Sequence, residues 1–195
     1  DEDKRLLEQT YKGFASNGAM LSSTNKAKLR HINASLAQLG PAFSKNVLED
    51  TNAFTYFTDD EAKLDGVPRH VLDNAKQLAT SQGKDGWCLT LHAPCYLPVM
   101  QYAHNRSLRA KLYKARGALA LGGERCNKAN IKRIVSLRQQ KAQLLGHDFY
   151  ADYVLTKRMA KNTDTVDGFL DELESKYRLA ALSEFSELET FAQKE

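Results

Sequence analysis

The chain has 195 residues, of which 42% are hydrophobic and 27% are charged, proportions that are ordinary for a globular protein. Its formal net charge is +4, from 28 basic and 24 acidic residues whose signs alternate along the chain. A nucleic-acid binder usually gathers Lys and Arg on one face or arm, so nucleic acid is not expected as a partner. No run of about 18 apolar residues occurs, so no membrane-spanning helix is expected either.

Both ends of the chain fall within helical patterns. The chain begins with Asp1, not Met, and the pattern at its far end runs to Glu195 without a stop signal. We therefore expect the chain to be cut from a longer polypeptide. No signal peptide opens it, and an odd number of cysteines (three) favours reduced thiols. A cytoplasmic location is expected, although a periplasmic one stays open because a leader can have been removed.

The sequence of the first half of the chain predicts three helices and a small β element. Helical spacing predicts a helix over residues 1–14, with Gly18 as its stop, and a long helix from Ser22 to Leu48. Gly40–Pro41 is expected to interrupt the long helix and kink it, because proline lacks a backbone N–H. Residues 53–58 (AFTYFT) and 86–91 (GWCLTL) are typical of strands and flank a helix from Pro68 to Gly83. An antiparallel pair on a helical body is the expected arrangement.

From Pro94 onward the pattern is helical. Four further helices are predicted, with these bounds: from Asn105 to Gly122–Gly123, from Asn127 or Asn130 to Gly146, from Phe149 to Leu155, and from Asn162–Thr163 to Glu195. The sequence therefore predicts a mostly α-helical fold, a bundle of long helices with one two-stranded element, in a single segment over residues 1–195.

The zinc motif H-E-x-x-H, which places two imidazoles on one face of a helix, does not occur. None of the five histidines is followed by Glu; they are His31, His70, His92, His104 and His147. A weaker metal candidate is Cys88–His92–Cys95, with Cys126 or His104 as a fourth ligand, because thiolate and imidazole suit zinc. Paired C-x-x-C knuckles are missing, so buried cysteines beside a hydrogen-bonded histidine are the favoured interpretation.

The sequence contains no convincing motif for a catalytic carboxylate pair, a phosphate loop, a serine nucleophile or a nucleic-acid-binding face. Asp59–Asp60–Glu61 lies where helix capping explains it, and Gly122–Gly123 is followed by Glu124, unlike a phosphate loop. No G-x-S-x-G elbow occurs. The basic stretch His104–Arg116 spreads its charges around a helix, as an ordinary exposed surface does. The glutamates of the last predicted helix suit a solvated face; they are Glu172, Glu174, Glu184, Glu187 and Glu189.

Taken together, several stretches resemble the thimet-oligopeptidase-like zinc metallopeptidases, with greatest likeness to their peptidyl-dipeptidase (dipeptidyl carboxypeptidase) branch. The stretches are LLEQTYKGFASNGAMLS (6–22), KAKLRHINASLAQL (26–39), FSKNVLEDTNAF (43–54), GWCLTLHAPCYLPVMQYAHNRSLRAKLYKA (86–115), IVSLRQQKAQLLGHDFYADYVLTKRMAK (134–161) and VDGFLDELESK (166–176). They keep the order found in that family and cover nearly the whole chain.

The resemblance implies a two-lobed helical enzyme whose central channel admits short peptides. Its zinc is held by an H-E-x-x-H helix and a further Glu, all downstream of the stretches matched here. No catalytic, cofactor-binding or metal residue is therefore expected on this chain. Its partners would be short peptides and the missing catalytic part of the same polypeptide, with zinc present only in the intact enzyme.

The leading hypothesis is thus a non-catalytic helical portion of a zinc-dependent peptidase, inactive alone, whose intact form releases C-terminal dipeptides. The alternative is a stand-alone helical interaction or scaffold protein that kept this fold without peptidase activity. Under the leading hypothesis, apolar faces left uncovered should promote self-association.

Overall fold

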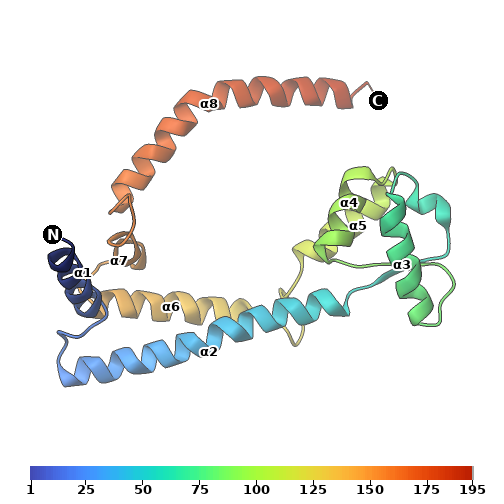
Figure 1. The fold of residues 1–195 in the computed structure, drawn as a ribbon. Helices are drawn as coiled ribbons and strands as arrows, with labels where there is room; N and C mark the ends of the chain where they lie inside the picture. The colour runs from blue at the N-terminus through green and yellow to red at the C-terminus, as the bar shows by residue number, and fades with distance from the viewer. Residues whose placement is uncertain (195) are drawn as a thin grey trace. The chain divides into compact units, whose positions relative to one another are not determined.

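In the computed structural model, which describes residues 1–194, helices dominate and one two-stranded antiparallel sheet is present (Figure 1). This confirms the predicted mostly α-helical fold with a small β element. The chain divides into two compact units: residues 35–135, and residues 1–34 together with the chain from Ser136 onward. None of the described helices combines the length and apolar character needed to cross a membrane.

The unit that contains both described ends is built from helices alone. It includes α1 (Glu2–Ser16), the start of α2 (Ser23–Ala53), most of α6 (Lys128–Leu144), α7 (Tyr150–Leu155) and α8 (Thr163–Ala192). The turn after α1 contains the predicted stop Gly18, whose φ is +91°. A Cβ there would lie 2.5 Å from Cδ2 of Leu29, so only glycine lets this turn pack against α2.

Helix α2 continues through Pro41, where the sequence predicted an interruption. Pro41 removes the hydrogen bond that the carbonyl of Ala37 would accept in the preceding turn. Ala37, Gly40 and Pro41 are all exposed, so solvent can bond the freed carbonyl and the helix need not end.

Within this unit Lys141 of α6 is partly withdrawn from water. Its Nζ donates to Oδ1 of Asn33 at 2.9 Å and lies 5.7 Å from the ring centre of Tyr153. Burial first, and repulsion by Lys157 second, lower the pKa of Lys141 below its usual 10.5. Just below pH 10.5, Lys141 is therefore protonated in a smaller fraction of folded molecules than of unfolded ones.

That difference predicts a pH dependence for stability. With the folded pKa depressed, the free energy of unfolding should rise with pH through the window that ends near 10.5. A Lys141→Met variant lacks this contribution, so the wild-type chain should gain stability relative to the variant between about pH 8 and pH 10.5. Urea unfolding of both proteins at the two pH values measures the difference in their free energies of unfolding. The titration of Tyr153, which is present in both proteins, cancels in that difference. If this difference stayed constant between the two pH values, or shifted in favour of the variant at the higher pH, burial would not penalise the charge of Lys141.

The unit formed by residues 35–135 contains the sheet. Strand β1 (Tyr56–Thr58) pairs with β2 (Trp87–Leu89) in the register Tyr56↔Leu89 and Thr58↔Trp87. Both strands are shorter than predicted, because α2 extends through Ala53 and a turn begins after β2. Gly86, with φ +145°, lets the two strands approach closely: a Cβ there would lie 2.5 Å from the carbonyl oxygen of Thr58.

The acidic cluster after β1 is a cap, as predicted. Asp60 accepts a hydrogen bond from the N–H of Ala62 at 3.1 Å and opens a short 3₁₀ helix, η1 (Glu61–Leu64). The same residue donates its own N–H to Oγ1 of the buried Thr58 at 3.2 Å. These contacts fix the route from β1 into the next helix.

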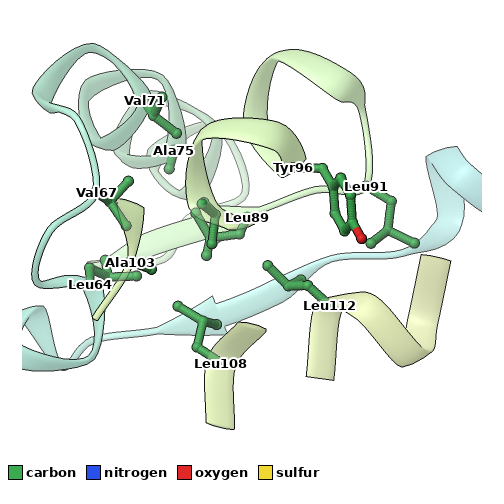
Figure 2. Close-up of a cluster of buried hydrophobic side chains, with 11 residues drawn as sticks. Leu64, Val67, Val71, Ala75, Leu89, Leu91, Tyr96, Ala103, Leu108 and Leu112 are labelled. Atoms are coloured by element: carbon green, nitrogen blue, oxygen red, sulfur yellow. The ribbon is translucent and has the colours of Figure 1, made fainter. Parts of the chain in front are cut away.

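Three helices cover the sheet and close a core: α3 (Arg69–Ser81), α4 (Ala93–Tyr102) and α5 (Arg106–Gly117). Each presents one apolar face inward because its buried residues recur three or four apart, as Tyr96 and Val99 do on α4 and Leu108 and Leu112 do on α5. Figure 2 shows these side chains converging. The cluster consists of Leu64, Val67, Val71, Ala75, Leu89, Leu91, Tyr96, Val99, Ala103, Leu108 and Leu112. Each fully buried leucine contributes roughly 1.5–3 kcal/mol of hydrophobic stabilisation.

The predicted caps of α5 and α8 are confirmed. Asn105 accepts from the N–H of Leu108 at 3.0 Å, and Asn162 accepts from the N–H of Thr165 at 2.8 Å. Helix α5, however, ends at Gly117 and not at Gly122–Gly123 as predicted. The reason is a long-range contact: the carboxylate of Asp50 on α2 takes the N–H of Ala120 at 2.8 Å, and Ala120 adopts a φ of +53°.

Candidate functional site

Cys88, His92 and Cys95, the strongest metal candidates in the sequence, do line one cavity in the unit formed by residues 35–135. Cys88 comes from β2, His92 precedes α4, and Cys95 lies in the first turn of α4. The cavity measures about 150 Å³, and α3 forms its other side. Its lining residues are Val71, Asn74, Ala75, Leu78, Cys88, Thr90, His92, Pro94 and Cys95.

The two sulfur atoms in this cavity have other partners. The thiol of Cys88, a residue only 1% exposed, donates to Oε1 of Gln82 at 3.6 Å. The sulfur of Cys95 accepts the N–H of Thr90 at 3.3 Å. All three cysteines of the chain are free thiols. The hydrogen bonds of the two sulfur atoms describe this cavity better than a metal centre does. Cys88 is buried as expected, but Cys95 is only half-buried, and His92 is exposed without a side-chain hydrogen bond to residues 1–194, so the predicted hydrogen-bonded histidine is wrong.

The two residues considered as a fourth ligand lie in other places. Cys126 donates to the carbonyl of Leu121 at 3.4 Å, in the turn before α6. His104 places Nδ1 3.0 Å from Oδ2 of Asp65, and both side chains are about three-quarters exposed. Across residues 1–194 no three side chains of His, Cys, Asp or Glu gather as a metal site. The residues described here thus do not fit a tetrahedral zinc ion.

Exposure predicts different reactivity for the three thiols. Cys88 is buried, whereas Cys95 and Cys126 are partly exposed. A thiol reagent should modify two cysteines in the folded chain and the third only after unfolding, because access limits the reaction of a buried thiol. Peptide mapping by mass spectrometry identifies which thiols react. Rapid labelling of Cys88 under native conditions would show that the β2–α3 packing is wrong.

The basic stretch His104–Arg116 is largely engaged within the protein. The guanidinium of Arg109 donates to the carbonyls of Ala103 and His104, capping the end of α4. Arg116 donates to the carbonyl of Leu91 at 2.5 Å and lies 4.7 Å from the ring centre of Tyr96. These side chains hold helices together, and so they do not form a row of free cations for phosphates.

A polar network that the sequence did not reveal joins the turn before α6 to α2. Its centre is Asn127, 2% exposed, whose Nδ2 donates to the carbonyl of Phe43 at 3.0 Å. Its Oδ1 accepts from the side-chain amides of Asn46 and Asn130, both at 2.9 Å. The sequence suggested Asn127 only as a helix start, because its partners on α2 lie more than eighty residues away.

An ion-pair cluster lies beside this network. Arg125 places Nε 3.3 Å from Glu49 and a terminal nitrogen 3.3 Å from Asp50. The hydrogen bonds that the Arg125 guanidinium donates to Asp50 and, second, to Glu49 raise its pKa. Asp50 also accepts the N–H of Ala120, so its carboxylate bonds two groups of the same turn. All charges here are paired, and the cluster fixes the turn without leaving a group poised for chemistry.

Comparison with known proteins assigns the chain to a family. Residues 99–195 match Peptidase family M3. Over 197 aligned residues the chain is 34% identical to Oligopeptidase A of Haemophilus influenzae, and 98% of the chain is covered. It is also 34% identical to the Probable cytosolic oligopeptidase A of Arabidopsis thaliana over 97% of the chain. Identity to the Dipeptidyl carboxypeptidase of Escherichia coli is 28%, over the full chain.

The matched region is a part of each relative. The chain spans 29% of the length of the Haemophilus influenzae protein, 28% of the Arabidopsis thaliana protein and 29% of the Escherichia coli protein. The resemblance to the thimet-oligopeptidase-like family is confirmed along the chain, but the expected greatest likeness to the dipeptidyl carboxypeptidase branch is not, because identity to Oligopeptidase A is higher. The chain belongs to peptidase family M3, the thimet-oligopeptidase-like peptidases.

Proposed function

We propose that this chain forms a non-catalytic helical part of a zinc-dependent oligopeptidase that hydrolyses short peptides. The observation that supports this most is the alignment of 98% of the chain with 29% of an oligopeptidase. The side chains described here support it as well, because they are engaged in packing, capping and paired charges. Zinc and its ligands would then belong to another part of the same polypeptide.

The bond that the intact enzyme cleaves is a finer part of the proposal. Release of C-terminal dipeptides rests on the likeness to the dipeptidyl carboxypeptidase of Escherichia coli, at 28% identity. The higher identity to Oligopeptidase A, 34%, supports hydrolysis of oligopeptides as the general activity, whichever bond is cleaved. The partners would be short peptides and the catalytic part of the same polypeptide. A cytoplasmic location is supported by the name of the cytosolic relative.

The alternative is a helical scaffold without peptidase activity. The unit of residues 35–135 supports this alternative because it encloses a core of its own between α3, α4, α5 and the sheet. A body of that kind can serve as a binding module whether or not a catalytic part follows.

A segment exchange tests the proposal. The stretch of Haemophilus influenzae Oligopeptidase A that aligns with this chain is replaced by residues 1–195, and hydrolysis of a fluorogenic oligopeptide is followed. We expect the exchanged protein to cleave the peptide and the same protein with the stretch deleted to be inactive. The 195-residue chain alone, given one equivalent of zinc, should be inactive.

Two outcomes would contradict the proposal. Zinc-dependent cleavage by the isolated chain would mean that it carries its own catalytic site. A folded but inactive exchange protein would favour the scaffold alternative. Mass spectrometry of the products from an active protein distinguishes dipeptide release from internal cleavage.

A further inference from the structure

Helix α8 has almost no cover within the described residues. It is 30 residues long, it contacts α7, and every residue from Asp167 to Lys194 is exposed. Helix α8 nevertheless carries more exposed large apolar side chains than any other described helix. The exposed ones are Phe169, Leu170, Leu173, Tyr177, Leu179, Leu182, Phe185, Leu188 and Phe191.

Most of these side chains form one stripe. Because successive residues on a helix are about 100° apart, residues three, four and seven apart share a face. The stripe runs the length of α8 and consists of Val166, Phe169, Leu170, Leu173, Tyr177, Leu188 and Phe191. Glu184 and Glu187 are the charged residues on it, both in its C-terminal half. A single stripe of this kind would suit a helix that covers one side of a core.

Leu179 and Leu182 do not belong to the stripe. By helical spacing they lie about 180° away from it, and they are 78% and 57% exposed. Three residues aligned with them along this opposite side are uncharged and small: Gly168, Ser175 and Ser186. The opposite side thus forms a second, narrow strip that is apolar at its middle and carries one charge, Asp164, at its N-terminal end.

Charges are concentrated on the two flanks between these faces. Lys176 pairs with Glu172 on one flank, and Arg178 pairs with Glu174 on the other. A helix at the surface of a protein usually keeps its exposed apolar side chains on one side, whereas α8 carries large apolar side chains on opposite sides, with paired charges on the flanks between them. This pattern is typical of a helix packed between two layers.

We propose that α8 is an interior helix of the complete peptidase, covered on the stripe and on the Leu179–Leu182 side by two different layers of the same polypeptide's remaining part. The proposal rests on the proposed function, which supplies that remaining part. The relatives support this occupant: they are more than three times the length of the stretch that this chain matches, since it spans 29% of them. The family match also extends through all of α8.

Cysteine substitution tests the two faces separately and does not depend on loss of stability. Leu173→Cys places a thiol on the stripe, Leu179→Cys on the opposite side and Ser183→Cys on a flank as the matched control. Each is made in the 195-residue chain and in the complete polypeptide expressed from its gene, and the rate of alkylation at that position is measured by peptide mapping. Hydrolysis of a fluorogenic oligopeptide is followed in the complete polypeptide.

In the 195-residue chain all three positions should react at similar rates, because all are exposed. In the complete polypeptide we expect alkylation at positions 173 and 179 to slow by roughly tenfold or more, and the flank position to slow far less. Protection at 173 with free reaction at 179, in a polypeptide that cleaves peptides, would overturn the two-layer inference and leave the proposed function intact. Absence of any further coding sequence or of peptidase activity would instead overturn the proposed function, and with it the occupant named here.

Discussion

Replacing Gly66 by alanine should destabilise the unit of residues 35–135 by about 3 kcal/mol or more. Gly66 has a φ of +84°, and a Cβ there would lie 2.2 Å from the carbonyl oxygen of Tyr102. That oxygen belongs to the backbone and cannot rotate away. The close approach is fixed by the neighbouring bond from the N–H of His104 to the carbonyl of Asp65, at 2.8 Å. The turn cannot withdraw without disturbing Leu64, which is 1% exposed in the core.

Gly83→Ala is the matched control. Gly83 has a similar φ of +69°, but no atom lies within 4 Å of a Cβ built on it. Only the left-handed backbone penalty applies there, about 1–2 kcal/mol. Urea unfolding of both variants and the wild type separates the steric contribution from the conformational one. Equal losses in the two variants would mean that the contact between Gly66 and the end of α4 is looser than described.

Asn127→Ala should be the second large loss, roughly 2–4 kcal/mol in the free energy of unfolding. The substitution removes three hydrogen bonds at once, those to Phe43, Asn46 and Asn130. The carbonyl of Phe43 loses the buried donor that bonds it. Leaving such buried groups unpaired carries their full desolvation cost, and alanine offers no compensating gain because Asn127 precedes α6.

Asn52→Ala provides the comparison, since Asn52 is exposed on the same helix, α2. We expect it to change the free energy of unfolding by less than about 0.5 kcal/mol. The two variants are compared by thermal and urea unfolding under identical conditions. If the loss at Asn127 matched the change at Asn52, the network would not be what fixes the turn before α6.

Helix positions could be predicted from the sequence because their signals are local. Apolar spacing located the helices, and the capping residues Asn105 and Asn162 act as expected. The end of α5 could not be predicted, because Asp50, seventy residues away, takes the N–H of Ala120. Helix α2 continues through Pro41, because solvent can reach the freed carbonyl, while the kink expected at Gly40–Pro41 stays a prediction.

The candidate site shows the same division between local and long-range information. The sequence placed Cys88, His92 and Cys95 near one another, and they do line one cavity. It did not reveal that Gln82 and the Thr90 N–H would take up the two sulfur atoms. The pattern of α8 was visible in part, since the glutamates suit a solvated face. The opposite side marked by Leu179 and Leu182 becomes evident only when the exposure of the whole helix is known.

The proposal that this chain is one part of a longer zinc peptidase can be tested by sequencing the source gene beyond Glu195 in the same reading frame. We expect the reading frame to continue and to encode an H-E-x-x-H motif, because the relatives are more than three times as long as the stretch matched here. Such a motif would supply the zinc ligands and the general base that residues 1–194 do not assemble. A stop codon immediately after the codon for Glu195 would contradict the account and leave a helical scaffold whose partner has to be identified.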